Sequence, residues 1–191
     1  MKNIILASQS PRRKQLLEQA EITFTIKTAH ANEDFPEEMP AEDAPIFIAK
    51  NKAEAVFLTL ENEEQRDAII IAADTVVVLD SKIIGKPQDE QDAIAILRRL
   101  SGRIHKVVTG VIIQTADSTE QIQETTEVHF LPISDAQIDH YIRIYKPFDK
   151  AGAYAIQEWI GLIGIKKIDG DFYNVMGLPI SKVVAALQQY L

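Results

Sequence analysis

The sequence contains no cysteine, and it lacks three further features that would have pointed to a function or a location. Without cysteine the chain can form no disulfide bond, thiolate metal site or thiol nucleophile, which fits a reducing compartment. Neither of the usual phosphate-binding loops, GxxxxGK(S/T) or GxGxxG, occurs. The apolar runs are far shorter than a membrane span, and the N-terminal segment shows no small-residue cleavage pattern. We therefore expect a cytoplasmic protein with no membrane partner.

The charge balance is acidic, with 28 Asp and Glu side chains against 20 Lys and Arg and a net charge of −8. Such a balance argues against a broad nucleic-acid-binding surface, so we expect no nucleic-acid partner. Any anion site has to be a local basic pocket, and a divalent metal would offset the repulsion of a polyphosphate. The length of 191 residues and the hydrophobic content of 46% suit one domain over residues 1–191, either undivided or with two lobes around a cleft.

Strand and helix patterns alternate along the chain, which predicts an α/β (mixed α+β) protein with a mixed sheet flanked by helices. The predicted strands cover residues 3–7, 23–27, 68–73 with a continuation over 75–79, 82–84, 107–114, 127–130 and 162–168. The predicted helices cover residues 11–21, 46–60, 89–100, 134–145 and 180–190. Residues 30–45 form a polar loop long enough to be functional or a lid, and residues 116–126 a polar part of a hairpin.

The most informative segment is residues 6–17, LASQSPRRKQLL, in which a strand runs through a polar turn into a helix. Pro11 suits the first helical position, and Ser10 before it can cap the helix. A helix N-terminus attracts anions, and Arg12 and Arg13 add forked donors that match phosphate oxygens. The segment therefore predicts a phosphate site that suits a polyphosphate. The alternative is two solvated charges in a first turn.

A second feature is Asp74, which interrupts an otherwise apolar strand. An unpaired buried carboxylate is costly, so Asp74 has to lie at a strand end, pair with a cation or bind a metal. The functional interpretation is a metal ligand or a general base, and the alternative is a strand-terminal aspartate that caps a turn. Thr75 beside it could bind a base, a sugar or a water molecule.

Three other segments carry weaker signals. Lys86 follows a glycine at a loop edge, where a solvated lysine is the simpler interpretation. Arg103 and His105 follow a helix that Gly102 can terminate, and their roles stay open. Residues 149–157 pack small side chains around one glycine, so a ligand or another backbone can come close. Gln157 at the end of this segment could read a base edge through its amide.

Five segments together resemble the motif series of the Maf family of nucleoside triphosphate pyrophosphatases, a family also linked to septum formation. Their order and spacing match over nearly the whole chain, and the combination is far more specific than any single segment. The segments are LASQSPRRKQLL (6–17), AADTVVVLDSKIIGKP (72–87), LRRLSGRIHKVVTGV (97–111), PFDKAGAYAIQ (147–157) and KIDGDFYNVMGLP (167–179). The fourth resembles the subgroup that acts on dTTP and UTP, rather than the one that favours 7-methyl-GTP.

The resemblance implies an elongated mixed sheet with a central cleft, similar to the inosine triphosphate pyrophosphatase fold. It implies hydrolysis of dTTP, UTP or modified pyrimidine nucleotides to the monophosphate and pyrophosphate. Asp74 would be the proton acceptor and, with Glu33, would bind a divalent metal, for which oxygen ligands suggest Mg²⁺ or Mn²⁺. The resemblance places substrate specificity at Arg12, Thr75 and Gln157, and phosphate binding at Ser8, Arg13, Lys52 and Lys86. A homodimer is an expectation from the resemblance alone.

The sequence departs from the family pattern at three points. Ala73 stands before Asp74 where glycine is frequent, Glu158 follows Gln157 where glycine is common, and Asp34 could take the place of Glu33. The rival function is a non-catalytic nucleotide-binding regulator of septum formation or cell division. Retention of the aspartate together with the full set of cations favours the enzyme.

Overall fold

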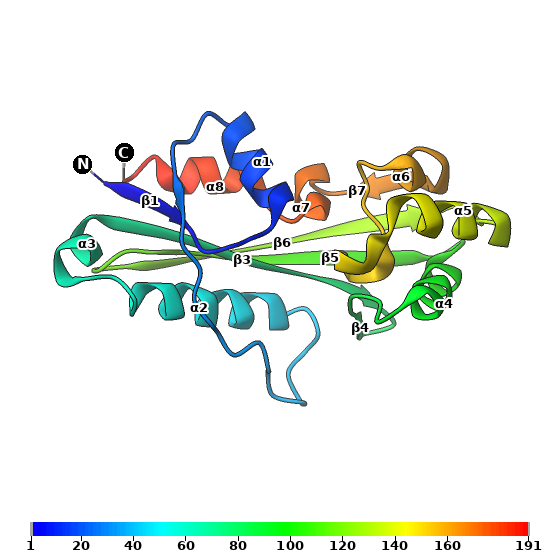
Figure 1. Cartoon of the computed structure of the whole chain (residues 1–191), viewed down its shortest axis with the longest axis horizontal. Helices are drawn as coiled ribbons and strands as arrows, with labels where there is room; N and C mark the ends of the chain where they lie inside the picture. The colour runs from blue at the N-terminus through cyan, green and yellow to red at the C-terminus, as the bar shows by residue number, and fades with distance from the viewer. Residues whose placement is uncertain (1, 191) are drawn as a thin grey trace.

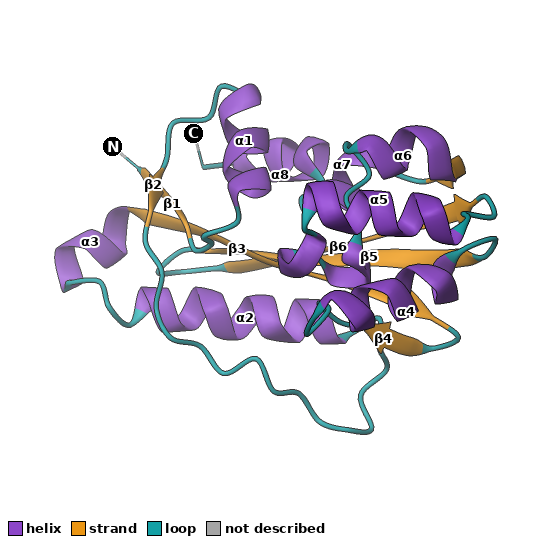
Figure 2. Ribbon diagram, turned by 45° about the vertical axis from the view of Figure 1, so that its right-hand side comes forward, coloured by secondary structure: helices purple, strands orange, loops and turns teal. Residues whose placement is uncertain are grey.

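The computed structural model describes residues 2–190, which form one mixed sheet with helices on both faces (Figure 2). The sheet has seven strands, β1 (Asn3–Leu6), β2 (Thr25–Ile26), β3 (Ala68–Leu79), β4 (Lys82–Ile84), β5 (Ile104–Gln114), β6 (Thr119–Phe130) and β7 (Ile165–Asp169). The helices are α1 (Pro11–Gln19), α2 (Ala44–Phe57), α3 (Asn62–Asp67), α4 (Glu90–Leu100), α5 (Asp135–Tyr145), α6 (Trp159–Gly164), α7 (Phe172–Met176) and α8 (Ile180–Leu187), with short 3₁₀ turns η1 (Pro147–Asp149) and η2 (Ala151–Ala153). The predicted fold class is confirmed.

The strand order is β2-β1-β3-β5-β6-β7, with β4 also paired to β3. β1 runs parallel to β2 and β3, and the other pairs are antiparallel. The long strands β3, β5 and β6 run the length of the molecule and join its two ends (Figure 1). Helix α2 lies along one face of the sheet, while α1, α7 and α8 cover the other face at the same end. Helices α4, α5 and α6 gather at the opposite end.

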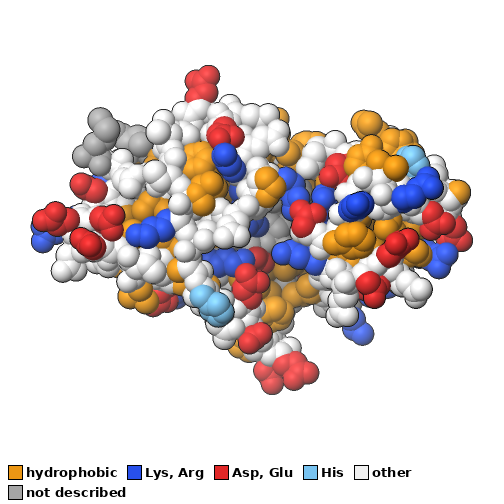
Figure 3. Space-filling model, in the orientation of Figure 1, with side chains coloured by type: hydrophobic (Ala, Val, Ile, Leu, Met, Phe, Trp, Pro, Cys, Tyr) orange, Lys and Arg blue, Asp and Glu red, His pale blue; other side chains and the backbone are white. Residues whose placement is uncertain are grey.

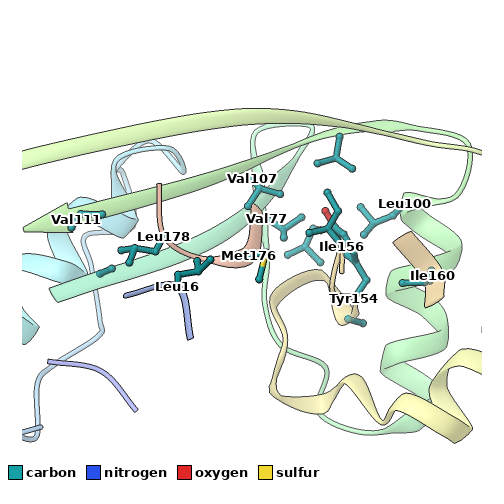
Figure 4. Close-up of a cluster of buried hydrophobic side chains, with 14 of the residues drawn as sticks. Leu16, Val77, Leu100, Val107, Val111, Tyr154, Ile156, Ile160, Met176 and Leu178 are labelled. Carbon is teal, nitrogen blue, oxygen red and sulfur yellow. The ribbon is translucent and has the colours of Figure 1, made fainter. Parts of the chain in front are cut away.

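Alternation along β3 divides the core between the two faces of the sheet. Ile69 and Ile71 belong to the large apolar cluster that includes Leu16 of α1, whereas Ile70 and Ala72 belong to the cluster beneath α2. The large cluster continues along the sheet, and Figure 4 shows Met176 and Val107 between its two ends. One strand therefore anchors helices on both sides.

One edge of β3 is only partly paired. β1 pairs with Ala68–Ile71 and β4 with Val77–Leu79, so no strand within residues 2–190 pairs with residues 72–76 on this edge. On the other edge β5 pairs continuously from Ile70 to Val78 and holds the strand extended. The gap exposes the middle of β3, where Asp74 and Thr75 lie.

Several sequence-based boundaries were wrong. The polar segment 116–126 is mostly strand, because β6 pairs with β5 from Thr119 to His129 and one of its faces meets solvent. Residues 162–164 end α6 instead of beginning a strand, since a short apolar run fits either structure. β5 begins at Ile104 and not at 107, and the short helices α3 and α7 were not predicted. No helix among the described residues is both long and apolar enough to cross a membrane.

Gly110 is required by the way that α2 meets the sheet. It pairs with Asp74 across β3 and β5, and a Cβ atom there would overlap the backbone of Ile46 at the start of α2. We expect Gly110→Ala to lower the free energy of unfolding by about 1–3 kcal/mol, because α2 would have to move away. Urea unfolding would measure the loss. Gly85→Ala is the matched control, since its Cβ would meet nothing within 4 Å; equal losses in the two variants would contradict the packing argument.

Candidate active site

A cavity of about 890 Å³ opens beside the gap in β3, between the two ends of the sheet. The structure brings all nine predicted site residues to its lining: Ser8, Arg12, Arg13, Glu33, Lys52, Asp74, Thr75, Lys86 and Gln157. They come from both ends of the molecule and from segments far apart in the sequence. Figure 3 shows Lys and Arg side chains with several carboxylates around the hollow near the middle of this face.

Asp74 and Thr75 reach the cavity from opposite faces of β3. Because side chains alternate between the two faces of a strand, Asp74 lies on the same face as Ala72, which α2 covers. Lys52 of α2 therefore contacts Asp74. Thr75 lies on the other face, where its hydroxyl meets Arg13 of α1. Because no strand covers this edge, both side chains line the same cavity.

Lys52 bridges two carboxylates. Its ammonium lies 2.7 Å from Oδ1 of Asp74 and 2.9 Å from Oε1 of Glu33. Asp74 is inside β3, with a side chain only 16% exposed, so the alternative of a strand-terminal cap is wrong and the cation-paired alternative holds. The hydrogen bond from Lys52 is the main cause of a lowered pKa at Glu33. Glu33, and not Asp34, lines the cavity.

Arg13 is buried and serves as an internal tie. Its guanidinium donates hydrogen bonds to the carbonyl oxygen of Gly177 at 2.8 Å, to Oγ of Ser8 at 3.2 Å and to Oγ1 of Thr75 at 3.0 Å. Burial lowers the pKa of Arg13, although an arginine stays protonated in proteins. Three of the five N–H donors therefore fix the turn after β1, the middle of β3 and the end of α7, and two remain for a ligand.

Arg12 points across the cavity. Its guanidinium forms an ion pair of 3.0 Å with Asp149 in η1, at the opposite end of the sheet. Burial opposes ionisation of Asp149, but the hydrogen bonds from Lys150 and Arg12 outweigh it and lower its pKa. The predicted cap by Ser10 was wrong: the Ser10 side chain makes no capping hydrogen bond, and its backbone N–H donates to Oγ of Ser8 at 3.2 Å.

Lys86 and Gln157 are also exposed at the cavity. Lys86 lies in the loop after β4, and Gln157 lies in the turn before α6. Within residues 2–190 neither side chain forms a hydrogen bond or ion pair with another residue. Both can therefore reorient toward a ligand without breaking a polar contact.

A second charged group lies on the cavity wall. Lys150 lines the cavity but is only 8% exposed, and its ammonium lies 2.7 Å from Asp149 and 3.5 Å from Glu158. Tyr154 also lines the cavity from the same segment. From the sequence, the run 149–157 indicated a close approach with charges at one end, and the role of Lys150 stayed open.

The cavity carries positive charge in an acidic protein. Five of its lining residues are Lys or Arg and three are Asp or Glu, whereas the whole chain has a net charge of −8. Such a lining attracts anions through its local field. The described part of the chain holds no group of three or more His, Asp or Glu side chains that could form a complete metal site. Asp74 and Glu33 still fit Mg²⁺, which takes one or two carboxylates together with substrate phosphates and water.

Arg103 and His105 lie outside the cavity lining. Arg103 pairs with Asp80 at 2.7 Å, and His105 is buried behind the cavity wall. Nε2 of His105 lies 2.8 Å from the hydroxyl of Tyr154, and its ring meets Tyr154 edge to face. His105 therefore supports a residue of the cavity wall from behind.

Comparison with known proteins identifies relatives along almost the whole chain. The family model described as Maf-like protein matches residues 3–190. The dTTP/UTP pyrophosphatase of Cytophaga hutchinsonii is 48% identical over 187 residues, which cover 98% of this chain and 84% of that protein. The dTTP/UTP pyrophosphatase of Phocaeicola vulgatus is 46% identical over 97% of this chain and 95% of its own length. That of Bacillus velezensis is 46% identical over 99% and 97%, respectively.

His105 gives a testable pH dependence. Burial lowers its pKa to about 4, with a smaller contribution from the charge of His129. The unfolded chain therefore binds the proton more readily between pH 4 and 6.5, so this group makes stability rise with pH across that window, by up to roughly 3 kcal/mol. We expect His105→Gln to flatten the pH dependence of urea unfolding between these limits. An unchanged slope would show that His105 titrates normally.

Proposed function

The chain belongs to the family of Maf-like proteins, and from this membership we propose that it hydrolyses dTTP and UTP to the nucleoside monophosphate and pyrophosphate. The observation that carries the proposal is the meeting of Asp74 with Arg12, Arg13, Lys52 and Lys86 around one cavity. A triphosphate needs cations along its length, and its hydrolysis needs a base that accepts the proton of water. The lining supplies both.

Asp74 would accept the proton of the attacking water. Lys52 holds Oδ1 of this carboxylate at 2.7 Å, which leaves Oδ2 outside that contact to accept the proton. Lys52, Lys86, Arg12 and the two remaining donors of Arg13 would hold the phosphate oxygens and the departing pyrophosphate. A divalent cation such as Mg²⁺ or Mn²⁺, held by Asp74 and Glu33, would polarise a phosphoryl oxygen and offset the phosphate charge.

The exposed side chain of Gln157 would recognise the base. The Gln157 amide offers one donor and one acceptor, which match the N3–H and O4 of thymine and uracil. The hydroxyl of Thr75 already accepts from Arg13 and shares a hydrogen bond of 2.9 Å with Thr109. We therefore propose that Thr75 affects specificity by placing Arg13. For Arg12 to affect specificity, its guanidinium would have to break its ion pair with Asp149.

The remaining features stay predictions. A cytoplasmic location and the lack of a nucleic-acid partner rest on the sequence, whereas a homodimer and hydrolysis of modified pyrimidine nucleotides rest on the family resemblance. The rival function, a regulator that binds nucleotides without turnover, would use the same cavity and release no product.

A panel of triphosphates tests the activity. We expect pyrophosphate release from dTTP and UTP at a kcat/KM at least about tenfold above that for CTP, GTP and 7-methyl-GTP, because a site with fixed donors and acceptors rejects mismatched bases. Release should require added Mg²⁺ or Mn²⁺ and stop with a chelator. Binding of every triphosphate without release of pyrophosphate would favour the rival regulator.

Removal of the proposed base tests the mechanism. Asp74→Asn should lower kcat by about 10²-fold or more, because an amide cannot accept the proton, while nucleotide binding measured by calorimetry persists. Asp34→Asn is the matched control, since Asp34 lies one residue from Glu33 but does not line the cavity. Full turnover in Asp74→Asn would assign the proton acceptor to another group.

A further inference from the structure

Glu158 stands immediately after Gln157. Its side chain is only 23% exposed and makes two contacts. One carboxylate oxygen accepts a hydrogen bond from the hydroxyl of Tyr141 in α5, and the other lies 3.5 Å from the ammonium of Lys150. Both contacts depend on the carboxylate, so a residue without it at this position would make neither.

Tyr141 holds both ends of the turn that carries Gln157. It is fully buried, and its hydroxyl donates to Glu158 while accepting a hydrogen bond of 3.1 Å from the backbone N–H of Ala155. The backbone N–H of Glu158 donates in turn to the carbonyl oxygen of Ala155 at 3.1 Å. One hydroxyl thus fixes the residues before and after Gln157, while the Gln157 side chain stays exposed at the cavity.

The same carboxylate is the end of a chain of charges that crosses the cavity. Lys150 lies between Glu158 and Asp149, and Asp149 pairs with Arg12 of α1. Arg12 and Gln157 both line the cavity, from opposite walls. Glu158 therefore contacts Tyr141, which holds the turn of Gln157, directly, and is linked to Arg12 only through Lys150 and Asp149.

Rigid placement matters for an amide that reads a pyrimidine. A glutamine amide pairs with uracil in one orientation and with cytosine after it rotates, because the donor and acceptor exchange places. A mobile turn would let the amide satisfy either base. A fixed turn limits its approach and supports discrimination.

We propose that Glu158 is a positioning residue for base selection, which acts with Tyr141 to lock the turn that presents Gln157. The proposal rests on the proposed function, because it assumes that a pyrimidine nucleotide occupies the cavity. It goes further in assigning part of the selectivity to two residues that hold the turn on either side of Gln157 and whose side chains form no hydrogen bond with it.

Three variants test the lock. Glu158→Ala removes both contacts, Tyr141→Phe removes the shared hydroxyl, and Glu158→Gln keeps an acceptor for Tyr141 but loses the charge near Lys150. We expect the first two to raise KM for UTP by about tenfold with kcat changed by less than about twofold, since they loosen ground-state recognition and leave Asp74 in place. Their preference for UTP over CTP should fall, and Glu158→Gln should restore most of it.

A ligand without a nucleobase distinguishes a loss of positioning at Gln157 from a general disruption of the cavity. Inorganic tripolyphosphate should inhibit wild type and the three variants equally, because Arg12 pairs with Asp149 and not with Glu158, and Lys150 keeps its 2.7 Å contact with Asp149 when Glu158 is changed. Tyr145→Phe is the matched control: it lies one turn along α5, stacks on Tyr141 at 5.0 Å, and its hydroxyl makes no hydrogen bond within residues 2–190. Equal weakening of tripolyphosphate and UTP, or unchanged selectivity in Glu158→Ala, would overturn the proposal.

The two proposals fail differently. If wild type releases no pyrophosphate from dTTP or UTP, the proposed function is wrong. Calorimetric binding of UMP and CMP to wild type and Glu158→Ala still measures base selection without turnover. A preference for UMP that persists in Glu158→Ala would contradict the positioning role even in an active enzyme.

Discussion

The site depends on a break in strand pairing along one edge of β3. On this edge, the pairing of β3 with β1 ends at Ile71 and its pairing with β4 begins at Val77. On the other edge β5 pairs continuously with β3 and keeps the strand extended across the gap. An extended strand directs neighbouring side chains to opposite faces. Elsewhere in the sheet this would separate Asp74 from Thr75, but at an uncovered edge both reach the same space. The cavity is therefore a consequence of sheet topology, and its charges come from β3, from α1 and α2 and from the loops and turns around the gap.

Within that frame, the two adjacent arginines have different tasks. Arg13 is buried among Ser8, Thr75 and Gly177, and it uses most of its donors to hold three segments together. Arg12 reaches across to Asp149 and is exposed enough to change partner. The sequence-based hypothesis assigned phosphate to Arg13 and specificity to Arg12. The geometry makes Arg13 chiefly an organiser of the phosphate wall, with two donors left over.

The sequence was most informative where one segment carries its own chemistry. The turn at Ser8 to Arg13 and the carboxylate at Asp74 could be identified from local pattern, and all nine predicted residues line one cavity. Sequence pattern was not enough where contacts between distant segments determine the length of a strand or the role of a side chain. β6 is polar because one face meets solvent, so its length is set by pairing with β5 and not by hydrophobic alternation. The role of Lys150 stayed open from the sequence, because its contact with Glu158 and the hydrogen bond of Glu158 with Tyr141 of α5 are set by the fold.

The acids of the cavity explain how so many cations can share it before a ligand arrives. Arg12 and Arg13 are neighbours, and the charge of Arg12 is one of the causes that lower the pKa of Arg13. Asp149 draws Arg12 to the far wall, and Glu33 and Asp74 occupy Lys52. The Arg12–Asp149 pair is partly exposed, and such pairs contribute only about 0–1 kcal/mol, so a triphosphate can displace the carboxylate at little cost. The Lys52–Asp74 pair is more buried and harder to exchange. The wall at Arg12 and Asp149 can therefore rearrange around the substrate, whereas the centre at Lys52 and Asp74 stays fixed for the chemistry.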